Sequence, residues 1–112
     1  MSKGIVAKRY AVALFQLAKE QNIIDQIENE LLVVKQVFTA NKELIDVLNH
    51  PKVTNETKKS IVKESFASLS QQVVNTLYIL IDRHRSDIVT DVVNYFVQHA
   101  NEARGTEDAT VY

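Results

Sequence analysis

Turn-forming residues are scarce in this chain, which has two Gly and one Pro in 112 residues. An all-β fold needs many tight turns, and Gly and Pro are the residues that favour them. Their scarcity therefore argues against such a fold. Apolar residues make up 46% of the chain, which is enough to build a core, and the length suits one domain. The sequence favours a single helical domain.

Apolar residues recur at helical spacing along most of the chain. The pattern is clearest where Ile24, Ile27, Leu31, Val34 and Phe38 follow one another at steps of three and four. We expect six helices, over about 4–21, 23–39, 42–48, 55–67, 71–83 and 87–104. The fold class predicted from this pattern is an all-α, six-helix bundle.

Polar and special residues mark the expected ends of these helices. Asn41, Thr54 and Ser70 stand where N-caps would begin the third, fourth and fifth helices. The third helix should end at His50, because a residue before proline avoids the α region. Gly105 stands where a glycine would end the last helix.

The end of the chain differs from the rest. Residues 109–112 read Ala-Thr-Val-Tyr, which is β-prone, and the chain contains no partner strand for them. We therefore expect a helical N-terminal domain over residues 1–105. Residues 106–112 would be a linker and the first residues of a C-terminal domain absent from this chain.

Composition excludes several classes of protein. Without Cys, the chain has no disulfide framework and no thiolate metal site. A formal net charge of −1 argues against an electrostatic grip on nucleic acid or on an anionic membrane. No signal peptide is visible, and the apolar runs are far shorter than the roughly 20 residues that span a bilayer. A cytosolic location fits these observations.

No catalytic constellation is evident. His84 and Asp87 are three residues apart, as are His99 and Glu102, but neither pair has a third metal ligand at a recognisable spacing. The serines lack a glycine elbow, and neither glycine lies in a phosphate loop. We expect no catalytic residue, no metal and no cofactor.

Two groups of basic residues are candidates for binding. Lys58, Lys59 and Lys63 form a ridge that we expect to be a solvated helix face, because nearby acids dilute its charge. The run from Arg83 to Arg85 could contact an acidic partner. It could equally stabilise a helix C-terminus, where cations favour the helix dipole.

The first helix has more apolar surface than one core contact requires. Its apolar residues form two adjoining stripes: Val6, Tyr10, Ala13 and Leu17, and then Ala7, Ala11, Leu14 and Ala18 with Phe15 at the edge. A small bundle could bury both stripes, or one could line a groove for a partner helix. Ile79 lies with Gln72, Thr76 and Arg83 on a face opposite the core stripe of the fifth helix. That face would belong to the groove if it adjoined the first helix.

These residues resemble the delta-subunit family of bacterial F-type ATP synthase, whose mitochondrial counterpart is the oligomycin-sensitivity-conferring protein. The run from Arg9 to Phe15, followed by Leu17 and Ala18, is similar to the opening helix of that family. The similarity continues in order through Leu48, Pro51, Val53, Lys58, Ile61, Phe66, Asn75, Leu77, Leu80, Arg85, Ile88, Phe96 and Gly105. His50 departs from the family, which often has Asn before this proline.

The resemblance implies a non-catalytic stator domain of six helices. In the family, this domain binds the N-terminal helical segment of an alpha subunit between its first and fifth helices, and the C-terminal domain joins the b-subunit stalk. The stalk holds the catalytic head still during proton-driven ATP synthesis, on the cytoplasmic side of the cell membrane and without membrane insertion. The predicted groove residues are Tyr10, Ala13, Leu14, Leu17, Thr76, Ile79 and Arg83.

Two other functions are compatible with a helical bundle. A small RNA-binding module of the antitermination type would need a basic face, which a net charge of −1 supports poorly. A generic interaction domain, such as a death-fold adaptor, would explain a groove but not the ordered set of matching residues.

Overall fold

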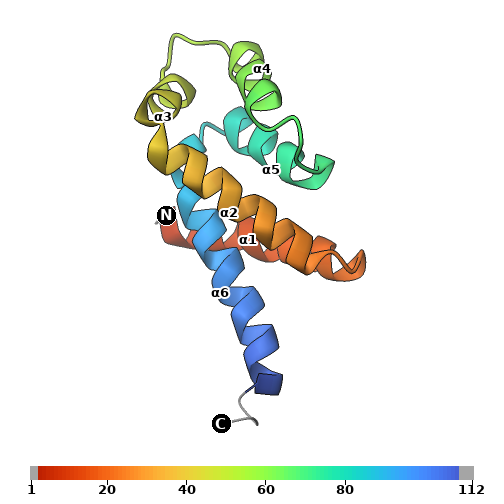
Figure 1. Ribbon diagram of the computed structural model, residues 1–112. Coiled ribbons are helices and arrows are strands. Elements are labelled where there is room, and N and C mark those ends of the chain that lie inside the picture. Colours follow the sequence, from red (N-terminus) through yellow and green to blue (C-terminus); the bar gives the residue numbers. More distant parts are fainter. Residues whose placement is uncertain (1–2, 109–112) are drawn as a thin grey trace.

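Helices account for almost all of the regular structure in the computed structural model, which describes residues 3–108 (Figure 1). The described residues contain six α-helices and one short 3₁₀ helix, η1, and no strand. The helices are α1 (Lys3–Glu20), α2 (Ile24–Ala40), α3 (Lys42–Asn49), α4 (Asn55–Ser65), α5 (Gln71–Asp82), η1 (Ser86–Ile88) and α6 (Val89–Asp108). The prediction of an all-α, six-helix fold is confirmed, and the predicted β-prone residues 109–112 at the C-terminus lie outside the described residues.

Only one of the three predicted N-caps uses its side chain as expected. Thr54 accepts a hydrogen bond from the backbone N–H of Thr57 at 3.1 Å, which satisfies one free donor of α4. Asn41 instead donates to the carbonyl of Val37 and so closes the end of α2. The side chain and the backbone N–H of Ser70 both donate to Glu30, which ties the start of α5 to α2. The cap positions are right, but two of the predicted cap bonds are wrong.

The last helix is longer than predicted. Gly105 lies inside α6, which continues to Asp108. A glycine ends a helix when it adopts a left-handed conformation, and no described glycine has a positive φ. A glycine inside a helix costs only about 1 kcal/mol relative to alanine, so the helix passes through it. The domain division between residues 105 and 106 remains a prediction.

α6 is the central element of the core. It packs along α1 and against α2, and its C-terminal end extends beyond the other helices (Figure 1). Phe96 of α6 is fully buried and meets Phe15 of α1 edge-on, with ring centroids 5.6 Å apart. A second aromatic pair, Phe38 and Phe66, joins α2 to the residue that ends α4. The predicted α2 stripe lies in this core from Ile27 to Phe38, and its first residue, Ile24, is half-buried against it.

α5 lies on the other side of the bundle from the long end of α6 and packs mainly against α4 (Figure 1). Its core face consists of Val73, Leu77, Leu80 and Ile81. α5 also contacts α1, so the two helices that carry the predicted groove residues are neighbours.

Candidate partner-binding groove

The two apolar stripes of α1 are buried unequally. One stripe lies entirely in the core: Ala7, Ala11, Leu14, Phe15 and Ala18. In the other stripe only Val6 is buried. Tyr10 is half-buried, Ala13 is exposed, and Leu17 exposes 36% of its surface. α1 therefore retains an apolar strip at the surface after its core contacts are made.

α5 presents a matching open face. Thr76 is half-buried, and Ile79 exposes 45% of its surface on the side away from the core stripe. The Thr76 hydroxyl donates to the carbonyl of Gln72 one turn earlier, so that it is satisfied within its own helix. A partner could therefore cover this face without leaving the hydroxyl unpaired.

A hydrogen bond at one end and a shared hollow at the other connect these two helices. At one end, the Gln72 amide donates to the side chain of Gln21, just after α1, at 2.6 Å. At the other end, Val6 and Tyr10 of α1 share a hollow of about 520 Å³ with Arg83, just after α5. The end of α1 therefore lies beside the start of α5, and the start of α1 lies beside the end of α5. The two helices run antiparallel. The predicted groove would lie between these two places.

Six of the seven predicted groove residues are at least partly exposed. Five lie on α1 or α5 and the sixth, Arg83, directly follows α5: Tyr10, Ala13, Leu17, Thr76, Ile79 and Arg83. Leu14 is the exception. It is 4% exposed and packs in the core, because it belongs to the stripe that faces inward. Periodicity showed two adjacent stripes on α1 but not which one the bundle would bury.

Sequence reasoning did not assign Arg9 or Arg85 to the groove, although both line the hollow beside Arg83. The run from Arg83 to Arg85 was the available signal. His84 between them adopts a positive φ of 56°, which turns the chain after α5. This turn lets Arg83 and Arg85, on either side of His84, line the same hollow.

The basic ridge of α4 is only partly solvated. Lys63 is exposed as expected, whereas Lys58 is buried and Lys59 binds Asp82 at 2.8 Å. The prediction of a solvated face is therefore wrong for Lys58, which lines a hollow beside the end of α3. A lysine can bury its stem against apolar neighbours while its ammonium remains near water.

The histidine pairs do not form a metal site. Across the part of the chain that the structure describes, no three His, Cys, Asp or Glu side chains gather closely enough to hold a metal ion. His99 is half-buried and packs edge-on against Phe15, with ring centroids 4.4 Å apart. His84 follows Arg83, the residue that caps the end of α5.

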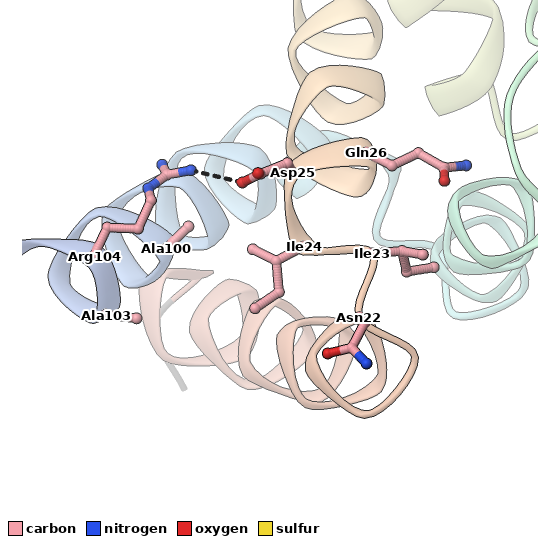
Figure 2. A pocket seen from close by; sticks show the side chains of 8 residues that line it. All are labelled: Asn22, Ile23, Ile24, Asp25, Gln26, Ala100, Ala103 and Arg104. Atoms are coloured by element: carbon pink, nitrogen blue, oxygen red, sulfur yellow. Dashed lines mark hydrogen bonds and ion pairs between the residues drawn. The ribbon is translucent and has the colours of Figure 1, made fainter.

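A second hollow, of about 380 Å³, lies between the start of α2 and the C-terminal half of α6 (Figure 2). Figure 2 shows Arg104 of α6 turned toward Asp25 of α2. Arg104 also donates two hydrogen bonds to the buried carboxylate of Glu28, at 2.8 and 2.9 Å. These bonds to Glu28 raise the pKa of the Arg104 guanidinium, so that raising the pH removes the stability they contribute only when the solution is strongly alkaline. This ion pair fastens α6 to α2.

Replacing Arg104 by Ala should lower the free energy of unfolding by about 1–2 kcal/mol, because the Glu28 carboxylate would lose both donors while remaining buried. The loss is moderate because Arg104 exposes 42% of its side chain. The control Asp25→Ala removes the exposed partner and should change stability by less than about 0.5 kcal/mol. Urea unfolding followed by circular dichroism measures both, and equal losses would contradict the assignment to Glu28.

Between residues 3 and 108, no helix combines the length and the apolar character needed to cross a bilayer.

Comparison with known proteins identifies similar sequences along the whole chain. The family model described as ATP synthase delta (OSCP) subunit matches residues 6–112. The chain is 55% identical to the ATP synthase subunit delta of Anoxybacillus flavithermus and 54% identical to that of Bacillus subtilis, over 112 residues in both cases. These matches cover 100% of this chain but only 63% and 62% of the two relatives. The chain therefore spans less than two thirds of the length of these relatives.

Proposed function

Because this chain belongs to the ATP synthase delta (OSCP) subunit family, we propose that it is the N-terminal domain of a non-catalytic peripheral-stalk subunit. Its role is to bind the N-terminal helical segment of an alpha subunit between α1 and α5. The subunit thereby couples the catalytic head to the b-subunit stalk during proton-driven ATP synthesis. The complex would hold it at the cytoplasmic side of the cell membrane.

The observation that carries this proposal is the open apolar strip along two antiparallel helices. Leu17 and Ile79 remain exposed on neighbouring helices, and Ala13 offers a small side chain between Tyr10 and Leu17. A small residue at this position lets a ligand helix approach closely. An amphipathic helix binds such a groove through its own apolar face.

A stator contact must resist torque, so it needs slow dissociation more than fast association. An interface of standard size buries roughly 1,200–2,000 Å² in total and could provide this. The groove extends from the hollow beside Tyr10 to the hydrogen bond between Gln21 and Gln72. This length exceeds three turns of α1, which is enough for several anchoring side chains of the ligand helix.

In the proposed assembly, the b-subunit stalk binds a C-terminal domain that follows residue 105. α6 points away from the bundle at this end, and its last described turn would lead toward that domain (Figure 1). The α1–α5 groove is formed by other helices, so the two partners would use separate parts of the subunit.

Replacing Ala13 by Asp should weaken binding of a synthetic alpha N-terminal segment at least about tenfold, because a carboxylate would be buried in an apolar interface. Ala13 is exposed, so the free domain should keep its fold. Titration calorimetry measures the affinity, and circular dichroism checks the fold.

The matched control is Gln36→Asp, which adds the same charge at an exposed position of α2 and should leave the affinity unchanged. Unchanged affinity in a folded Ala13→Asp variant would refute the groove. Tight binding of RNA with a steep salt dependence would favour the RNA-binding alternative instead.

A further inference from the structure

Three arginines surround the hollow at one end of the groove: Arg9 of α1 and Arg83 and Arg85 after α5. We propose that this arginine pocket binds carboxylates of the docked helical segment and so sets the direction in which that segment lies. The inference rests on the proposed function, because it concerns the same groove. Beyond the proposed function, it states which chemical groups lie at one end of the docked segment and in which direction that segment lies.

The arginines of the pocket have no acidic partner among the described residues. The two nearest acids in sequence are engaged elsewhere: Asp82 binds Lys59 at 2.8 Å, and Asp87 binds Lys3 at 2.7 Å. No ion pair or side-chain hydrogen bond within residues 3–105 joins Arg9, Arg83 or Arg85 to a carboxylate. Three arginines thus line one hollow without an internal counter-charge among the described residues.

The pocket fits carboxylates attached to an apolar helix. Guanidinium groups donate paired, planar hydrogen bonds that match a carboxylate. Val6 and Tyr10 line the rest of the hollow, and their apolar side chains suit the stem of an acidic side chain. The whole chain carries a net charge of −1, so the positive charge here is local.

The groove is electrostatically asymmetric along its length. The arginines occupy one end, the apolar residues Ala13, Leu17 and Ile79 lie along the middle, and the neutral amides of Gln21 and Gln72 close the other end. A nucleic acid would need positive charge along its whole path. A helix with acidic residues at one end fits this distribution, and its acidic end would lie beside the start of α1.

The test measures binding of two forms of one synthetic alpha N-terminal segment by titration calorimetry. One form is native, and in the other all Asp and Glu residues are replaced by Asn and Gln. In the full chain, the double substitution Arg83→Gln and Arg85→Gln should weaken binding of the native segment roughly tenfold. It should change binding of the amide form by less than about twofold, since that form has no carboxylate to lose.

The control is Lys42→Gln, which removes one positive charge from an exposed position of α3 and should not change either affinity. A spin label on the acidic end of the segment should broaden the NMR signals of Val6 and Tyr10 more than those of Leu17 and Gln21. The reverse pattern would overturn the predicted direction.

Other outcomes separate this inference from the proposed function. If Ala13→Asp weakens binding but the arginine substitutions affect both forms equally or not at all, the arginine pocket is refuted and the groove stands. If neither substitution matters, both proposals fail. Displacement of the native segment by millimolar inorganic phosphate, with no difference between the two forms, would show a general anion site and overturn the carboxylate assignment.

Discussion

Replacing Val34 by Asp should prevent stable folding, whereas Asp at the neighbouring Val33 should leave the chain folded. Val34 lies on the core face of α2 and is fully buried. An aspartate there would place a carboxylate among apolar side chains with no hydrogen-bond partner, at an expected cost above about 4 kcal/mol. Such a loss is comparable with the whole stability of many small domains, which is about 5–15 kcal/mol.

Val33→Asp is the matched control, because Val33 is the preceding residue of α2 and exposes 45% of its surface. Its expected change in stability is within about 0.5 kcal/mol. Circular dichroism and urea unfolding of both variants measure the contrast. A Val34→Asp variant that unfolds cooperatively at nearly the parent's urea midpoint would contradict the assigned core face of α2.

Replacing Phe96 by Ala should lower the free energy of unfolding by about 3–5 kcal/mol. Phe96 is fully buried on α6, the helix that packs along both α1 and α2, and its ring meets Phe15 edge-on. The smaller side chain would leave a cavity at the centre of the core that the surrounding helices could fill only in part.

Val97→Ala is the control, because Val97 is the next residue of α6 but is only half-buried. The expected loss there is about 1 kcal/mol. Urea unfolding measures the free energy of unfolding of both variants. An equal slope of that free energy against urea concentration shows that the two values can be compared. Similar losses at the two positions would mean that α6 is not the central helix of the core.

The positions of the helices were largely predictable because their signals are local. The α2 stripe, the break before Pro51 and the cap at Thr54 each depend on residues within one or two turns. One failure involves a partner distant in sequence, because Ser70 bonds to Glu30 of another helix. The other two are local: Asn41 bonds to Val37 within its own turn, and Gly105 keeps a negative φ, so that α6 continues to Asp108.

The candidate site shows the same division. Periodicity identified the excess apolar surface of α1 and the outward position of Ile79, and both are present in the structure. It placed Leu14 with the groove residues, although Leu14 packs in the core. It also left two roles open for the run from Arg83 to Arg85, which the turn at His84 brings to the hollow beside Tyr10.

By itself, the sequence determined the helical class and the order and approximate ends of the helices. It also contained, in the expected order, the series of residues by which the family is recognised. These properties follow from hydrophobic periodicity and from the local chemistry of Pro and cap residues. Only the tertiary structure decided which stripe of α1 is buried and which arginines line the hollow at one end of the proposed groove. The physical reason is that burial and charge clustering depend on how helices pack, and packing joins residues as distant in the chain as Tyr10 and Arg83.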